Sequence, residues 1–214
     1  MCKMRDVSES EALFSEVMSA LEDGNYQRAI EIYGAILTRW QAHVEICERA
    51  SAGLGEVYIT LRKLRLAQNC VKQALGYDPL APHYHYLLGF IYSLDRWWDR
   101  ARVEFEVAVK GDPENPEYLR GLGWVLCNSG RLRKGRGYLL RALALAPDDV
   151  SILTNLALVS MDAREFDKAL EYAQRAARIA PSNALVQLTF EVVAAVKHFA
   201  DNTGGKEEAA KLAQ

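Results

Sequence analysis

The sequence predicts an all-α fold, a right-handed α-solenoid of about five helical hairpins with a C-terminal capping helix. A 34-residue step supports this prediction, because prolines recur at that interval at positions 79, 113, 147 and 181. Two further rows keep the same step. They are Leu54-Gly55, Leu88-Gly89, Leu122-Gly123 and Leu156-Ala157, and then Ala67, Ala101, Gly135 and Ala169. Self-similarity at a fixed period is typical of repeat proteins whose units stack on their neighbours.

Each recurring residue has a packing role in a helical hairpin. Two helices that cross closely need a small residue where their backbones meet, and the two rows supply one on each helix. The proline ends the second helix, because it lacks an N–H and clashes with the preceding turn. Pro82 and Pro116 suit the first turn of the next helix, where no hydrogen bond is lost. Asn115 precedes Pro116 and is a good N-cap.

The hairpins are expected to follow one another in a single solenoid over residues 1–200. The predicted units are 10–47, 48–81, 82–115, 116–149 and 150–181. About four extra residues near positions 38–47 predict a longer helix or a loop there, because Ala29 precedes Ala67 by 38 residues. Residues 182–200 are expected to form a helix that caps the last repeat. Residues 201–214 begin with a polar, glycine-containing stretch and are expected to form a flexible tail.

These motifs resemble the tetratricopeptide repeat (TPR) family. The resemblance covers roughly residues 48–181 as four consecutive units, and Leu13, Gly24-Asn25-Tyr26 and Ala29 fit a weaker unit upstream. The tryptophan that the family often carries early in the first helix is absent. The resemblance implies that the first helix of each hairpin lines a concave surface, and that segments of partner proteins bind there.

One register of the first helices predicts the residues of that groove. Large apolar side chains with charged neighbours indicate a site for an apolar or amphipathic segment of a partner protein. The expected groove residues are Phe14, Met18, Arg49, Tyr86, Phe90, Glu117, Arg120, Trp124, Leu158 and Met161. The chain is then a protein-binding scaffold, adaptor or co-chaperone. The clamp with which some family members hold chaperone C-termini is missing, since its positions carry Ala52, Glu56, Leu87, Glu117 and Gly121.

A basic rim at the hairpin tips is the alternative binding surface. It consists of Arg62, Arg65, Arg96, Arg131, Arg133, Lys134 and Arg136. Stacked tips of this kind could bind nucleic acid or an acidic partner. The other interpretation is a solvated edge with local ion pairs, because Asp95 and Asp99 dilute the charge of one tip.

Composition and motifs argue against catalysis. The net charge of −2 exerts no general attraction to nucleic acid or a membrane surface, and no apolar run approaches the length of a membrane span. There is no phosphate-binding loop, nucleophile motif or zinc-protease motif. His83 and His85 are two residues apart on a predicted helix, so they point to different faces. We therefore expect no enzyme activity, no cofactor and no metal.

Location and self-association are the remaining expectations. The four cysteines share no metal-type spacing, and three lie in helical patterns, so a reducing compartment is indicated. The polar start of the chain does not resemble a secretory signal, and we expect a cytoplasmic protein. The last helix is apolar around most of its surface. Either it forms a homodimer, or the last repeat and the tail cover it.

Overall fold

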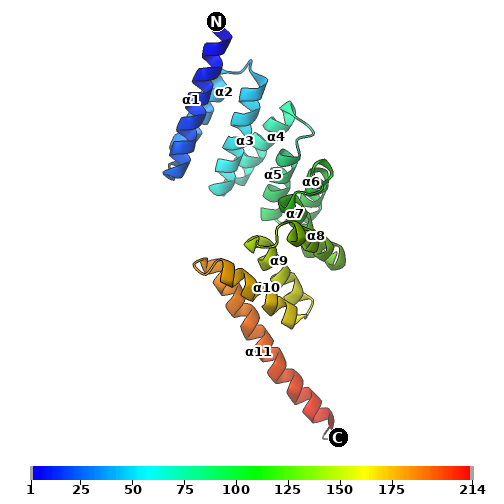
Figure 1. The fold of residues 1–214 in the computed structure, drawn as a ribbon. Coiled ribbons are helices and arrows are strands. Elements are labelled where there is room, and N and C mark those ends of the chain that lie inside the picture. The colour runs from blue at the N-terminus through cyan, green and yellow to red at the C-terminus, as the bar shows by residue number, and fades with distance from the viewer. Residues whose placement is uncertain (1, 213–214) are drawn as a thin grey trace. The chain divides into compact units, whose positions relative to one another are not determined.

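The computed structural model describes the backbone of residues 2–212 and the side chains of residues 8–202. This part of the chain contains eleven α-helices and no β-strand (Figure 1), which confirms the all-α prediction. The helices are α1 (Cys2–Glu22), α2 (Tyr26–Arg39), α3 (Val44–Thr60), α4 (Leu64–Tyr77), α5 (Pro82–Leu94), α6 (Trp98–Gly111), α7 (Pro116–Asn128), α8 (Leu132–Leu145), α9 (Val150–Asp162), α10 (Phe166–Ile179) and α11 (Ala184–Leu212).

Two compact units make up the chain, residues 1–112 and residues 113–214. Unit 1 holds the hairpins α1–α2, α3–α4 and α5–α6. Unit 2 holds α7–α8 and α9–α10, followed by α11, which packs on α10 and α9. Within each unit, the helices that pack together are at most two apart in the sequence, as expected for stacked repeats.

Close helix crossings lie at the small residues that the repeat predicts. A Cβ atom on Gly123 would lie 2.8 Å from the backbone oxygen of Gly135, and one on Gly89 would lie 3.1 Å from the Phe105 ring. Ala157 and Ala169 are fully buried in one cluster at the corresponding crossing of α9 and α10. The hairpins α5–α6, α7–α8 and α9–α10 are therefore held by contacts that a larger residue would open.

Side-chain caps start α7, α9 and α11, and they recur at the same 34-residue step. The carboxamide oxygen of Asn115 accepts hydrogen bonds from the backbone N–H groups of Glu117 and Tyr118. Asp149 caps α9 and Asn183 caps α11 in the same way. These oxygens satisfy donors that have no partner inside the helix, so each cap sets where its helix starts.

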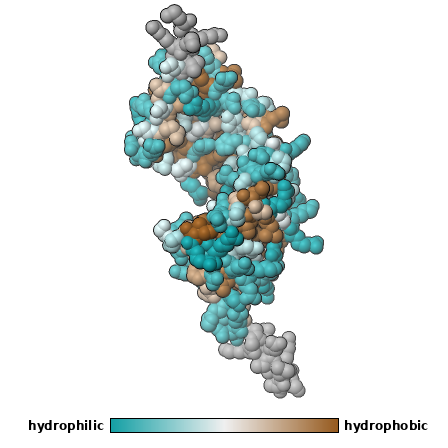
Figure 2. All heavy atoms as spheres, in the orientation of Figure 1, coloured by the Kyte–Doolittle hydropathy of each residue, from teal (hydrophilic) through white to brown (hydrophobic). Residues whose placement is uncertain are grey.

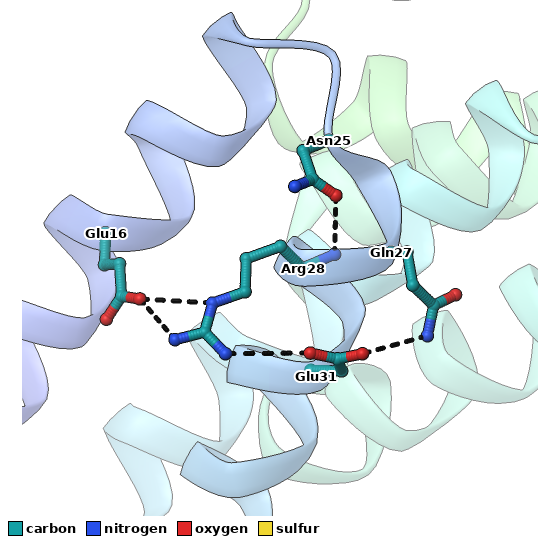
Figure 3. A network of polar contacts seen from close by, with 5 residues as sticks. All are labelled: Glu16, Asn25, Gln27, Arg28 and Glu31. Carbon is teal, nitrogen blue, oxygen red and sulfur yellow. Dashed lines mark hydrogen bonds and ion pairs between the residues drawn. The ribbon is translucent and has the colours of Figure 1, made fainter.

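The core of unit 1 joins α1, α2, α3 and α4. Phe14, Tyr33, Ile36, Trp40 and Leu54 are among its buried members. At the edge of this core, Arg28 of α2 reaches Glu16 of α1 at 2.6 Å and Glu31 at 3.6 Å (Figure 3). These charges are about half exposed, so they add little stability and serve mainly to orient α1 against α2.

Two helix lengths depart from the regular repeat. Helix α3 has 17 residues whereas α5, α7 and α9 have 13, so the four extra residues lengthen α3. The expectation that the cap ends at residue 200 and a tail follows is wrong for the backbone, since α11 is helical to Leu212. Once a packed segment has formed a helix, extending it costs little, and Lys197–Asp201 pairing supports the extension.

Candidate functional site

The inner residues of α1 and α3 contact one another in unit 1. The guanidinium of Arg49 lies 3.8 Å from the centre of the Phe14 ring and donates to Glu11 at 2.7 Å. Phe14 is only 5% exposed and belongs to the core, so the expectation that its ring lines an open wall is wrong. Arg49 covers the ring and itself stays exposed.

A pocket of about 540 Å³ lies beside this pair, at the start of α3. Phe14, Arg49 and Glu11 line one side of it, and Val44 and Ile46 line another. Met18, one turn further along α1, is exposed. Phe14 and Arg49 therefore border an accessible hollow, although Phe14 contributes little surface to it, and Met18 lies outside its lining.

Tyr86 and Phe90 stack on one another along α5. Their ring centroids are 6.3 Å apart, and Tyr86 also contacts the buried ring of Phe105 at 5.7 Å. Tyr86 is 7% exposed, so it is a core residue and the prediction that it lines an open wall is wrong. Phe90 is partly exposed, and His83 extends the stack while contacting Glu56 at 3.0 Å.

The sequence argument missed Tyr33, a residue of α2 that reaches the inner face. A Cβ on Gly53 of α3 would overlap the Tyr33 hydroxyl, so the ring enters between α1 and α3 at that glycine. Burial raises the pKa of Tyr33, and the nearby Glu56 carboxylate raises it further. The lone Gly53 next to the Leu54-Gly55 pair is the only sequence signal for this contact.

The three predicted apolar groove residues of unit 2 remain partly exposed. They are Trp124 on α7 and Leu158 and Met161 on α9, and we call them the inner row. Trp124 and Leu158 are one repeat apart, and α7 contacts α9 directly. Arg120 lies one turn before Trp124 and is 3.8 Å from Glu117. The inner row thus combines accessible apolar surface with charged groups at its edge.

The predicted basic residues of unit 1 lie at two hairpin tips. Arg62 and Arg65 line a pocket of about 640 Å³ together with Trp97. Trp97 is 46% exposed, and the Arg100 guanidinium lies 4.7 Å from its ring centre. Arg96, at the same tip, lies 6.0 Å from the ring of Trp98. Figure 2 shows brown patches of hydrophobic residues in a mostly teal surface.

The basic residues of unit 2 divide into two groups. Arg131, Arg133 and Lys134 line a hollow of about 470 Å³ at the tip of α7–α8. Arg136 instead donates to Glu165 of the next hairpin at 2.6 Å. This hydrogen bond is the main cause that lowers the pKa of Glu165 to about 2. Arg136 therefore joins two hairpins and is not available as a rim residue.

No arrangement of titratable groups resembling a catalytic or metal site occurs in the part of the chain with described side chains. His83 and His85 have separate partners, since His85 contacts Glu104 and the Pro79 carbonyl. Over residues 8–202 there is no cluster of three or more histidine, cysteine or acidic residues that could hold a metal. None of the described helices has the length and apolar character needed to cross a membrane.

Two curated proteins match the sequence over most of this chain. Anaphase-promoting complex subunit 3 of Schizosaccharomyces pombe is 21% identical over 134 residues, and the BBSome complex member BBS4 of Bos taurus is 29% identical over 147 residues. The matches cover 63% and 69% of this chain but only 20% and 27% of the relatives. The chain thus spans about a quarter or less of their length.

Solved structures of similar size share the fold. The type IV pilus biogenesis factor PilW superposes with a TM-score of 0.78 at 21% identity, covering 95% of this chain and 91% of PilW. TTC0263, a thermophilic TPR protein of Thermus thermophilus, gives 0.71 at 19% identity, with coverage of 86% and 98%. YrrB, a TPR protein with an unusual peptide-binding site, gives 0.61 at 19% identity, with coverage of 89% and 97%.

Family models agree with these structures. Two of them, each described as tetratricopeptide repeat, match residues 20–89 and 121–184, which together make up more than half of the chain. The matched segments contain the close crossings at Gly55 and Gly123 and the cap at Asp149. The chain belongs to the tetratricopeptide repeat family.

Proposed function

We propose that this chain is a non-catalytic scaffold or adaptor, of the co-chaperone type, that binds an apolar or amphipathic segment of a partner protein on the inner row of unit 2. The observation that supports this proposal is the accessibility of Trp124, Leu158 and Met161. Of the rings predicted for the groove in unit 1, Phe14 and Tyr86 lie one turn earlier in the repeat and are buried by their own neighbours, whereas Phe90, which is one repeat before Trp124, is partly exposed. TPR proteins generally mediate protein–protein interactions, and YrrB is described as having a peptide-binding site.

The chemistry of the inner row suits an apolar side chain flanked by charge. An indole presents a large rigid surface with few rotatable bonds, so burying it against a partner costs little side-chain entropy. Such aromatic anchors dominate many interfaces, where truncation costs about 2 kcal/mol or more. Arg120 and Glu117 at the edge would set the direction of the bound segment through its charges.

A peptide-display selection on the intact protein tests this proposal. Peptides selected on the wild type should bind Trp124→Ala at least about tenfold more weakly, which corresponds to about 1.4 kcal/mol. Leu140→Ala is the matched control, because Leu140 is an exposed apolar residue of α8 outside the inner row. Equal loss in both variants, or no loss in Trp124→Ala with unchanged helicity, would contradict the site.

The tips of unit 1 are a second candidate site, for an acidic partner or nucleic acid. The guanidinium groups of Arg62, Arg65, Arg96 and Arg100 form no ion pair with the carboxylates of residues 8–202. Arg62 and Arg65 line a pocket with the exposed Trp97, Arg100 lies over its ring, and Arg96 lies near Trp98. If these arginines bind polyanions, fluorescence anisotropy with single-stranded RNA and with polyglutamate should show binding that weakens steeply with salt. Changing Arg62, Arg65 and Arg96 together to Glu should abolish it, and no binding at low salt would exclude this candidate.

The cysteines support our proposal of a cytoplasmic location. Cys47, Cys70 and Cys127 are free thiols, and burial raises the pKa of Cys70 and raises that of Cys127 to about 11. The thiols of Cys70 and Cys127 therefore stay protonated at neutral pH and react slowly. Their free state fits a reducing compartment, where disulfides do not form.

A further inference from the structure

Helix α11 packs on unit 2 through one face only. Val186 and Val193 are buried on this face, against Leu153 and Ala176 in one cluster and Ala157, Ala169 and Ala173 in another. At the end of the same face, Lys197 forms an ion pair with Asp167 of α10 at 2.9 Å. Together with the partly buried Phe190, these contacts cap the last hairpin.

A second apolar stripe runs along another face of α11. Leu185, Leu188 and Phe199 are 69%, 55% and 70% exposed, and Val192 and Ala195 between them are exposed as well. The intervals are three, four, three and four residues, which is the spacing of a coiled-coil seam. Because α11 continues as a helix to Leu212, the following residues do not fold back over the stripe.

We propose that this stripe, residues 185, 188, 192, 195 and 199, is a dimerisation seam that pairs with α11 of a second copy in antiparallel orientation. The three- and four-residue intervals place the seam residues at two alternating heptad positions. In an antiparallel pair, a residue at one of these positions faces a residue at the other position on the partner helix. Phe199 of one copy then faces Leu188 of the other, and Val192 faces Ala195. The Leu188–Phe199 layers thus flank a centre of smaller side chains, so the helices approach most closely where they cross, and Leu185 lies outside these layers, opposite Asn202.

The polar residues beside the seam favour the antiparallel orientation. Glu191 and His198 flank the seam on one side, and neither forms an ion pair within residues 8–202. In the antiparallel register, Glu191 of each copy lies opposite His198 of the other, which gives two symmetric contacts. In the parallel register, Glu191 would lie opposite the apolar Val196.

The hydrogen bonding of His198 is compatible with this contact. The Asn202 amide nitrogen donates to Nε2 of His198 at 3.0 Å. When Nε2 accepts, the ring proton resides on Nδ1, which can donate to a carboxylate. Asn202 thereby holds His198 in the tautomer that the Glu191 carboxylate of a second copy requires.

Analytical ultracentrifugation over a concentration series tests the seam. The wild type should form a dimer at concentrations between about 1 and 100 µM, because mass action favours association at higher concentration. Leu188→Glu should weaken the dimer at least tenfold without lowering the melting temperature. Leu140→Glu makes the same change at an exposed position of α8 and should leave the dimer intact. A wild type that is monomeric at every concentration, or equal weakening by both variants, would overturn the proposal.

Cysteine crosslinking and charge reversal test the orientation. A mixture of Leu188→Cys and Phe199→Cys proteins should form a disulfide between unlike chains. Neither variant alone should crosslink above the wild-type background, because like positions lie about 16 Å apart along an antiparallel pair. Glu191→Lys should weaken the dimer, and adding His198→Glu should restore it. Crosslinking of each variant with itself, or no restoration, would overturn the antiparallel arrangement.

Discussion

Arg96 occupies a backbone conformation that is costly for any residue with a Cβ atom. Its φ is 60°, and Arg62 and Arg164 have φ of 57° and 59° at the equivalent positions of their hairpins. Gly24 and Gly130 occupy this position in the other two hairpins. The turn after each first helix therefore requires a left-handed residue whatever the side chain, and three hairpins use arginine there.

Arg96→Gly should stabilise the protein by about 0.5–1 kcal/mol, because the relief of left-handed strain exceeds the entropy that glycine adds to the unfolded chain. Urea unfolding followed by circular dichroism measures this difference. Arg100→Gly, within α6, is the control and should destabilise by about 1 kcal/mol. If Arg96→Gly is less stable than the wild type, the contact of Arg96 with Trp98 outweighs the strain.

Gly135 and Gly137 form a matched pair on α8. A Cβ on Gly135 would lie 2.5 Å from the backbone oxygen of Gly123, whereas one on Gly137 would meet nothing within 4 Å. Gly135→Ala should destabilise by about 1–3 kcal/mol, because the two backbones must separate. Gly137→Ala should stabilise by about 0.5–1 kcal/mol. Thermal unfolding of both variants measures this, and similar effects of the two would contradict the close crossing.

At the scale of elements, polar contacts between hairpins recur less regularly than the apolar crossings. Arg175 of α10 donates to the Pro147 carbonyl and to Asp148, and Arg141 of α8 donates to the Pro113 carbonyl one repeat earlier. By contrast, the bond from Arg136 to Glu165 has no counterpart among the described residues of unit 1. It connects α8 to the turn before α10, and its contribution to stability is expected to depend on pH.

The stability contributed by Glu165 should depend on pH. Its pKa is lowered to about 2, chiefly by the hydrogen bond from Arg136. A carboxyl group whose pKa is lowered by folding stabilises the fold at pH values above its ordinary pKa. This stabilisation is lost as the pH falls toward the pKa of the group in the folded protein. The melting temperature of Glu165→Gln should therefore lie below that of the wild type at pH 7, and the two should converge between about pH 4.5 and 2. A constant difference across this range would contradict the assigned pairing.

At the scale of the whole molecule, stability is expected to be local. Within each unit, helices pack only on near neighbours in the sequence, so a repeat is stabilised by the repeats beside it. The last hairpin depends on α11, whose buried Val193 covers Ala157, Ala169 and Ala173. Loss of this cap should open the end of unit 2 before it affects the rest.

Val193→Asp should speed hydrogen exchange in α9, α10 and α11 while α3 and α4 keep their protection. The buried carboxylate should cost about 2–4 kcal/mol, and in a repeat array that cost falls on the adjoining helices. Hydrogen–deuterium exchange with mass spectrometry measures it helix by helix. Val103→Asp, at an exposed position of α6, is the control and should leave all protection unchanged. Uniform loss of protection in Val193→Asp would show that the array unfolds as one block.

The sequence alone determined where the hairpins lie and how they are built. The 34-residue step located the crossings at Gly55, Gly89 and Gly123, and the cap at Asn115 was evident from its neighbour Pro116. These features depend on contacts within one hairpin, between residues about a dozen positions apart, so a repeating pattern encodes them directly. The extra residues before Ala67 indicated a longer helix or a loop, and the structure shows that they lengthen α3.

Only the tertiary structure decided which inner residues are accessible. Phe14, Tyr86 and Trp124 are all aromatic residues of the predicted groove, yet Arg49 covers Phe14 and Phe105 packs against Tyr86, while Trp124 stays partly exposed. It also decided that Arg136 pairs with Glu165 and that α11 continues past residue 200. The exposure of a side chain depends on residues supplied by other helices. Those residues differ from repeat to repeat, and the period that positions the backbone does not specify them.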